Sequence, residues 1–125
     1  MHHSKADLTP RVLGEYEGRW ADGAGWRLAF EHMPAQFPPD PSIFAGLPDD
    51  RCQCLHVGYV VRGSFRVTYK DGREEVVREG EGYVLEPGHF VQTIDAVDLV
   101  EFSPVDEHDR TMATIARNVE AMAQA

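Results

Sequence analysis

The sequence predicts an all-β fold, a barrel or a sandwich, followed by one C-terminal helix. Short segments rich in Val, Phe and Tyr recur between residues 51 and 102, and turn signals such as Asp71-Gly72 and Pro87-Gly88 separate them. Beyond residue 102 the period changes, and apolar residues follow at helical spacing. A chain of 125 residues is the size of one domain, so we expect a single domain over residues 1–125.

Composition excludes several classes of function. The net charge is −9, from 12 Lys and Arg against 21 Asp and Glu, and no basic stripe is present. We therefore expect neither nucleic acid nor an anionic membrane as a partner. No apolar run approaches the length of a membrane span, and no signal peptide is recognisable, so the cytoplasm is the expected location.

The N-terminal part has weaker patterns. Residues 1–10 are polar and aperiodic, and we expect a loose tail. Residues 11–20 are predicted to form a short strand, and residues 26–33, which alternate large and polar side chains, a second one. Residues 34–50 hold five prolines, which cannot donate to a sheet ladder, so a long loop is predicted there, and in an enzyme this loop would act as a lid.

From residue 51 the turn signals become regular. A turn at Arg62-Gly63 and a hairpin at Asp71-Gly72 separate strands predicted at residues 52–61, 64–70, 73–78, 83–85, 89–94 and 98–102. A helix is predicted over residues 104–123. Its apolar stripe should pack on the barrel or on a partner subunit, and consists of Met112, Ile115, Ala116, Val119 and Met122.

The segment from Cys52 to His56 carries the chemistry. Cys52, Cys54 and His56 occupy every second position, and in a strand such residues leave the same face. In a strand, the Cα atoms of Cys52 and Cys54 would lie near the upper limit of the distance that a disulfide allows. A reduced pair is therefore expected, in agreement with a cytoplasmic chain. Thiolate and imidazole groups on one face indicate a metal site.

Two segments resemble the motifs of the cupin superfamily, small RmlC-like β-barrels that often hold one metal. The segment ending in Val60-Val61-Arg62-Gly63 is similar to the end of the first motif, and the segment from Gly80 to Pro87-Gly88 to the start of the second. The sequence of residues 46–59 also resembles that of a bacterial subgroup of cupin-like proteins. The resemblance implies a double-stranded β-helix, or jelly-roll barrel, and pairing into a homodimer.

The resemblance also places the ligands, although this chain departs from the usual residues. His56 and Cys52 occupy ligand positions of the first motif, and His89 lies two residues before the histidine position of the second. A shift of two keeps a strand residue on the same face. The candidate metal ligands are Cys52, Cys54, His56 and His89.

The ligand count separates two kinds of site. Four ligands would make a closed, structural site, whereas Cys52, His56 and His89 alone would leave a position open for water or substrate. Zinc suits this set best, and iron or another transition metal is the alternative. Taken singly, each cysteine or histidine is more often a core residue.

Other polar residues have competing interpretations. Glu86 is either a carboxylate that orients a ligand imidazole or a charge at the barrel rim. Tyr59 and Tyr83 are assigned to the core or the pocket, where a hydroxyl can donate a proton. His32 is expected to make an exposed hydrogen bond, His108 to be solvated and Glu101 to point outward.

Two functions follow from these observations. The first is a metal-dependent enzyme acting on a small polar organic molecule. The second is a non-catalytic barrel that binds a ligand or a partner, with a structural metal or none. A homodimer fits both, and the sequence does not identify the substrate.

Overall fold

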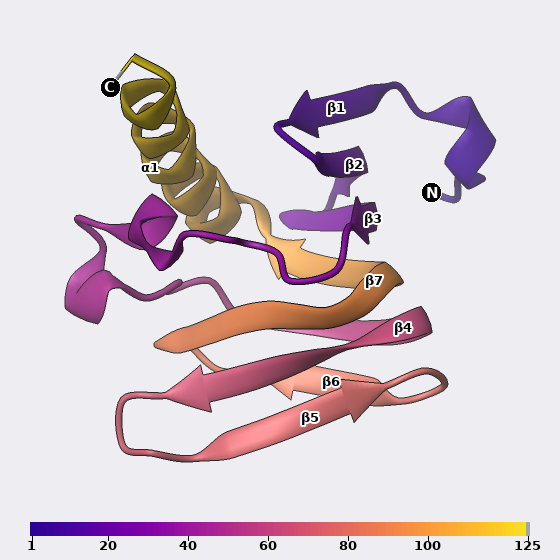
Figure 1. Cartoon of the computed structure of the whole chain (residues 1–125). Helices are drawn as coiled ribbons and strands as arrows, with labels where there is room; N and C mark the ends of the chain where they lie inside the picture. The colour runs from indigo at the N-terminus through magenta and orange to yellow at the C-terminus, as the bar shows by residue number, and fades with distance from the viewer. Residues whose placement is uncertain (125) are drawn as a thin grey trace.

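The computed structural model describes residues 1–124 as a curved sheet followed by a helix (Figure 1). The strands are β1 (Pro10–Leu13), β2 (Tyr16–Gly23), β3 (Trp26–Met33), β4 (His56–Tyr69), β5 (Glu74–Arg78), β6 (Gly82–Leu85) and β7 (His89–Pro104). The helix is α1 (Val105–Gln124), and short 3-10 turns are η1 (Lys5–Asp7), η2 (Pro41–Phe44) and η3 (Pro48–Asp50).

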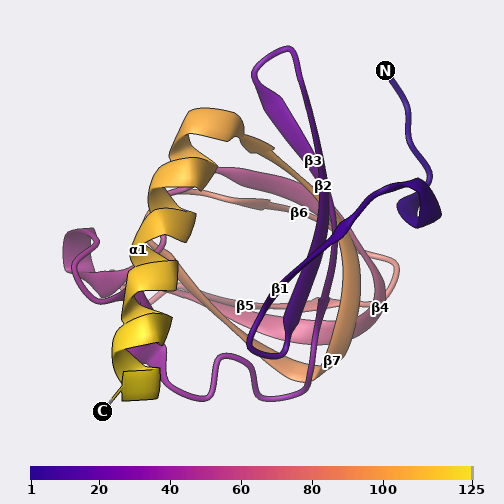
Figure 2. The same cartoon turned by 90° about the horizontal axis from the view of Figure 1, so that it is seen from above.

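All strand pairs are antiparallel, in the order β1-β2-β3-β7-β4-β5, and β6 also pairs with β4. The first residues of β4 pair with β6 and its last residues with β5, while β7 runs along its other edge. Figure 2 shows the sheet curving around a central space, with α1 along the open side. The predicted all-β fold with a C-terminal helix is confirmed.

The predicted turn at Arg62-Gly63 is wrong, because β4 continues through it. The register of β4 against β7 shifts between Val60 and Phe65, which marks a β-bulge where the strand bends. Gly63 has a φ of +88°, and a Cβ there would collide with the carbonyl oxygen of Ala96. The partner region also continues, so that residues 89–94 and 98–102 belong to one strand.

Two predicted strand boundaries are also wrong. Residues 11–20 form parts of two strands that turn at Gly14, where φ is +60°. The strand predicted from residue 52 begins only at His56. Cys52 instead makes a single bridge to His89: its N–H donates to the His89 carbonyl at 3.0 Å, and its carbonyl accepts from Gly88 N–H at 2.8 Å. Cys54 has no strand partner.

The proline-rich segment 34–50 is fastened to the sheet and to the helix. The Thr93 hydroxyl donates to the carbonyl of Pro34 at 2.6 Å and accepts from the N–H of Phe37 at 2.8 Å. The Asn118 side-chain amide of α1 donates to the carbonyls of Ile43 and Ala45 at 2.6 and 2.9 Å. These bonds hold the segment between β7 and α1, across one end of the barrel.

The core lies on the inward faces of β4 to β7, and α1 completes the enclosure. Val60, Phe65, Val67, Val97 and Leu99 are almost fully buried there. The buried residues of α1 are His108, Thr111 and Thr114, whereas Ala116 of the predicted apolar stripe is exposed. Met112 and Ile115 of that stripe are half-buried and line the cavity, so the helix presents both polar and apolar side chains to the barrel. Within residues 1–124, no helix is long and apolar enough to cross a membrane.

Candidate metal centre

Cys52, His56 and His89 converge at one end of the barrel. All three are buried, and one potential ligand atom from each lies within 4.8 Å of the others. His56 opens β4, His89 opens β7, and the backbone bridge to His89 holds Cys52 beside them. The Cys52 sulfur lies 3.6 Å from His56 Nε2. Two residues four positions apart and a third from a distant strand thus present one sulfur and two imidazoles to a common point.

Both imidazoles are oriented through their other nitrogen. His89 Nδ1 lies 2.6 Å from the Glu86 carbonyl oxygen, which can only accept, so Nδ1 carries the proton. His56 Nδ1 lies 2.7 Å from the Ser103 hydroxyl and 3.2 Å from the Glu101 carboxylate. With Nδ1 protonated, each Nε2 keeps its lone pair for a metal ion.

The protonation states suit a divalent cation. Burial lowers the pKa of His56 and of His89 to about 4, so both imidazoles are neutral near pH 7. Burial raises the pKa of the Cys52 thiol to about 12, so without a cation the thiol keeps its proton. A bound metal ion displaces such a proton and binds the thiolate. One sulfur and two nitrogens fit zinc and other transition metals.

Cys54 does not belong to the cluster formed by Cys52, His56 and His89. Its side chain is fully buried, and its sulfur lies 3.4 Å from the Leu55 carbonyl oxygen. The predicted shared face rested on a strand over residues 52–56, and this segment is not a strand. The structure therefore collects three of the four predicted ligands.

Some of the other predicted pocket residues lie near the site, and others lie on the surface. The Glu86 carboxylate is exposed, 3.8 Å from Arg73 Nη1, and it is the Glu86 carbonyl that orients His89. Tyr59 is 50% exposed on the outer face, so its assignment to the core or pocket is wrong. Tyr83 is buried, and its hydroxyl donates to Glu101 Oε1 at 2.9 Å. His32 bonds to Asp98 at 2.8 Å and is partly exposed, as expected.

Two predictions about polar residues are wrong in an informative way. Glu101, expected to point outward, and His108, expected to be solvated, are 8% and 4% exposed. Glu31 of β3 was not singled out and is equally buried. On β3 the inward positions are Arg27, Ala29 and Glu31, while the large residues between them face out. Alternation signals a strand but not which set of side chains faces the interior.

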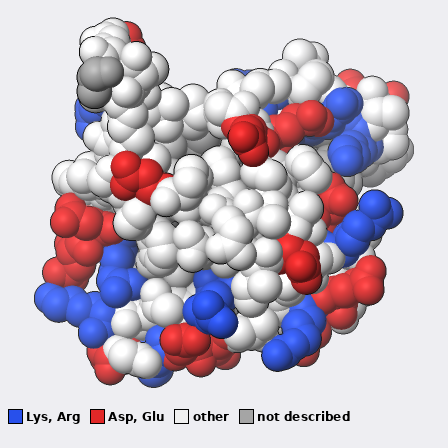
Figure 3. Space-filling model, in the orientation of Figure 1, with Lys and Arg blue, Asp and Glu red and all other residues white. Residues whose placement is uncertain are grey.

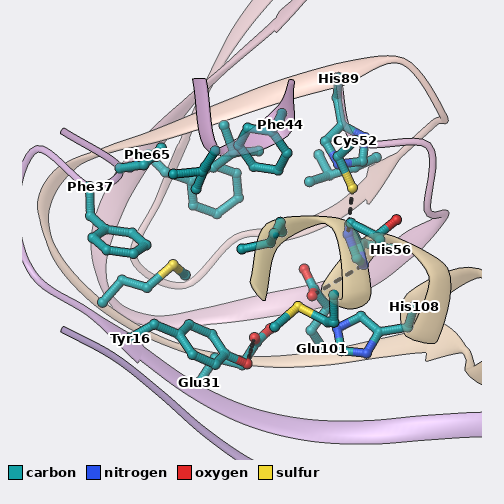
Figure 4. A pocket seen from close by; sticks show the side chains of 18 of the residues that line it. Tyr16, Glu31, Phe37, Phe44, Cys52, His56, Phe65, His89, Glu101 and His108 are labelled. Atoms are coloured by element: carbon teal, nitrogen blue, oxygen red, sulfur yellow. Dashed lines mark hydrogen bonds and ion pairs between the residues drawn. The ribbon is translucent and has the colours of Figure 1, made fainter. Parts of the chain in front are cut away.

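Glu31 and Glu101 form a buried carboxyl pair beside the centre (Figure 4). Burial and then the charge of Glu101 raise the pKa of Glu31 to about 8, and burial also raises the pKa of Glu101. The Tyr16 hydroxyl donates to Glu31, and Trp20 Nε1 donates to that hydroxyl at 3.1 Å. The pair therefore holds one proton at neutral pH, within reach of His56 through Glu101.

His108 closes the polar end from the helix. Its Nδ1 accepts from Arg27 Nη1 at 2.8 Å, and the same guanidinium pairs with Asp22 and Asp109. Because arginine only donates, His108 carries its proton on Nε2. Its ring lies 6.2 Å from that of His56, centre to centre. These contacts fix the start of α1 against β3.

A cavity of about 140 Å³ lies between these groups and the core. Its polar end is formed by the three candidate ligands, the carboxyl pair and His108. The rest of the lining is mostly apolar and includes Phe37 and Phe44 from the proline-rich segment, Phe65 from β4 and Met112 and Ile115 from α1. Figure 4 shows Phe37 and Phe65 at one side of the cavity and His56 with Cys52 at the other.

Comparison with known proteins identifies the fold. No family model matches the chain, and no curated protein matches it in sequence. Ectoine synthase from P. lautus is 12% identical with a TM-score of 0.61, over 88% of this chain and 85% of that one. The polyketide cyclase RemF from Streptomyces resistomycificus is 19% identical with a TM-score of 0.58, over 83% and 78%.

A third solved structure, an RmlC-like cupin from Shewanella frigidimarina, is 15% identical with a TM-score of 0.58, over 82% of this chain and 88% of that one. At these identities the likeness establishes the fold and not the activity. The chain has the cupin fold. The jelly-roll barrel predicted from the two motif-like segments is confirmed.

Proposed function

We propose that this chain binds one divalent metal ion, zinc in the first place, through Cys52, His56 and His89. The observation that carries the proposal is their convergence within 4.8 Å together with Nδ1 contacts that leave both Nε2 lone pairs free. A closed four-ligand site is disfavoured, because the Cys54 sulfur is directed to the Leu55 carbonyl. Three protein ligands leave a coordination position for a small molecule.

We further propose that the chain is an enzyme acting on a small organic molecule. The metal, when bound, supplies Lewis-acid chemistry at the polar end of the cavity. Glu31 and Glu101 hold a proton there in a buried site, beside the cavity. A perturbed carboxyl pair beside a cavity is typical of a catalytic site. Two proteins of similar fold are named as a synthase and a cyclase, which supports an enzymatic role.

The test is elemental analysis of protein purified without a histidine tag, with the variants Cys52→Ala and Cys54→Ala. We expect about one metal per chain in the wild type, loss in Cys52→Ala and retention in Cys54→Ala. The second variant is a matched control, since both thiols are free and buried. Loss of metal in both would indicate a closed structural site, and metal retained in Cys52→Ala would refute the ligand assignment.

We also propose that two copies pair through the outer face of the sheet. Val57, Val84 and Phe102 are register neighbours on β4, β6 and β7, and together with Tyr59 they are exposed. Apolar neighbours of this kind mark interaction surfaces. On the face seen in Figure 3, Lys and Arg lie among Asp and Glu at the sides and bottom, around a central area with few charges. A Tyr59→Lys variant that remains dimeric in light scattering would count against this surface.

A cytoplasmic location remains part of the proposal. Both cysteines are free, which fits a reducing compartment. Reduced thiols are also required for Cys52 to bind a metal ion.

A further inference from the structure

The geometry points to a ligand class: a neutral monocyclic molecule, benzene-sized in its apolar part, with one hydroxyl or carbonyl group directed at the carboxyl pair and the proposed metal ligands. The direction of the head group rests on the proposed function. The apolar part does not, because the walls that recognise it lie away from the metal ligands. The sequence leads to a small polar molecule, whereas the cavity fits a small molecule that is mostly apolar and has one polar group.

Size sets the first limit. The cavity measures about 140 Å³. An engineered cavity of about 150 Å³ lined by Leu, Ile and Phe in another protein stays dry and binds benzene. The cavity in this chain therefore accepts one six-membered ring, and excludes a sugar chain, a nucleotide or a fused polycyclic body unless the walls move.

The lining sets the second limit. Phe37, Phe44 and Phe65 supply ring faces and edges, and Val91, Leu99 and Ile115 supply aliphatic walls. Offset or edge-to-face packing against such rings favours a flat apolar body. A molecule with hydroxyl groups on every carbon would leave those groups without hydrogen-bond partners along these walls, and each unpaired hydroxyl would weaken binding.

Charge sets the third limit. Among the described residues that line the cavity, none is a lysine or an arginine, and two are the buried carboxyls of Glu31 and Glu101. In the metal-free chain, a ligand with a permanent negative charge would lie beside these groups without a basic side chain to balance it. A hydroxyl can instead donate to a carboxyl oxygen of Glu31 or Glu101, and a carbonyl oxygen can face the proposed metal ligands. Without metal, the walls therefore select a neutral head group.

A way in is visible at the apolar end. A second pocket, of about 470 Å³, lies next to the cavity and shares Leu13, Phe37, Pro38 and Ile43 with it. Its outer rim is formed by the β1–β2 turn, the proline-rich segment and Val119 and Met122 of α1. A ring entering between these elements meets the apolar walls first, with its head group leading towards the polar end.

The experiment is a titration of the purified full-length chain with phenol, benzoate and glycerol, followed by calorimetry and by NMR shifts, with the metal content of each sample measured. We expect saturable one-to-one binding of phenol, binding of benzoate at least about tenfold weaker in chelator-treated protein, and no saturable binding of glycerol. Phenol should bind with and without metal.

The variants are chosen to fill the cavity. Val91→Phe and Ile115→Phe place a ring where the ligand ring would lie, and Val61→Phe adds a ring at a position that is 49% exposed and does not line the cavity. We expect phenol binding to fall by more than about tenfold in both cavity variants and to be unchanged in Val61→Phe. Two cavity variants are used so that one that misfolds does not decide the result.

The outcomes separate this inference from the proposed function. Metal retained without saturable phenol binding would overturn the inference and leave the metal proposal intact. A chain that binds phenol but takes up no zinc when zinc is added would refute the metal proposal and support the apolar part of the inference. Benzoate bound as tightly as phenol in chelator-treated protein would overturn the neutral head group, and phenol binding unchanged in both cavity variants would place the ligand elsewhere.

Discussion

The two ends of the cavity are built from opposite kinds of residue. The apolar end gathers side chains whose burial stabilises the fold, such as Phe65, which is 1% exposed. The polar end gathers Glu31, Glu101 and three neutral imidazoles, each of which loses hydration when it is buried. Stability therefore comes from one end, and the other end holds groups that cost stability. Such a cost is typical of sites that bind or react.

Removing the apolar end should have the largest effect on folding. Phe65→Ala empties the space beside Tyr83, whose ring packs edge-on at 5.1 Å, and should lower the free energy of unfolding by about 3–5 kcal/mol. Phe102→Ala, at a position 43% exposed, should cost about 1 kcal/mol. Urea denaturation measures both. Equal losses would mean that the inward and outward faces of the sheet contribute equally to stability. Burial at the apolar end would then not be the main source of stability.

Substitutions at the polar end should change metal affinity more than they change the free energy of unfolding. His56→Gln removes a proposed ligand and should lower zinc affinity by more than about 100-fold, since even residues that only orient a ligand give roughly 10–100-fold. His108→Gln changes an equally buried imidazole whose Nδ1 faces Arg27, and should keep affinity within about threefold. Competition with a chromogenic chelator measures both. Similar losses in the two variants would refute the assignment of His56.

The sequence predicts the apolar end better than the polar end. Alternation in residues 64–70 indicates a half-buried strand, and turn signals place most neighbours, so the barrel and its C-terminal helix could be predicted. The bulge at Gly63 could not, because a glycine in a strand and a glycine in a turn look alike in sequence. Both produce a local bend, and only the partner strand distinguishes them.

Three of the four predicted ligands lie together in the structure, but partly for a reason that the sequence pattern does not contain. Cys52 reaches the site through a backbone bridge to His89, a contact between distant residues that no local pattern contains. Glu101 and His108 were misplaced because a charged residue is usually exposed. Their burial depends on partners from other strands, Tyr83 for Glu101 and Arg27 for His108. The phase of an alternating strand is likewise decided by tertiary packing.

A smaller effect is expected from the carboxylate that orients His56. Glu101→Gln keeps the shape of the side chain but removes its charge next to His56 Nδ1, 3.2 Å away, and should lower zinc affinity by about tenfold. Glu86→Gln is the matched control, because only the backbone carbonyl of Glu86 contacts His89 and the side chain is exposed. If Glu86→Gln weakens zinc binding as much as Glu101→Gln does, the effect is a general loss of charge. The orienting role assigned to the Glu101 carboxylate is then refuted.

The smallest effect is the dependence of stability on pH, and it separates the two kinds of buried group at the polar end. The pKa of Glu31 is about 8 in the folded chain against 4.5 ordinarily. Its contribution is complete below pH 4.5 and is lost as pH rises through 8. The pKa values of His56, His89 and His108 are about 4 against 6.5, so these residues reduce stability only as pH falls below 6.5.

Above about pH 7.5 the histidines are almost fully neutral in both states, whereas Glu31 still holds part of its proton in the folded chain. Metal-free protein should therefore lose roughly 0.5 kcal/mol of unfolding free energy per pH unit near pH 8. Glu31→Gln should remove that slope, whereas Glu79→Gln, at an exposed position, should leave it unchanged. Urea titrations at several pH values measure the slope. A slope that persists in Glu31→Gln would mean that the proton of the carboxyl pair belongs to Glu101, and that the two acids exchange their roles beside His56.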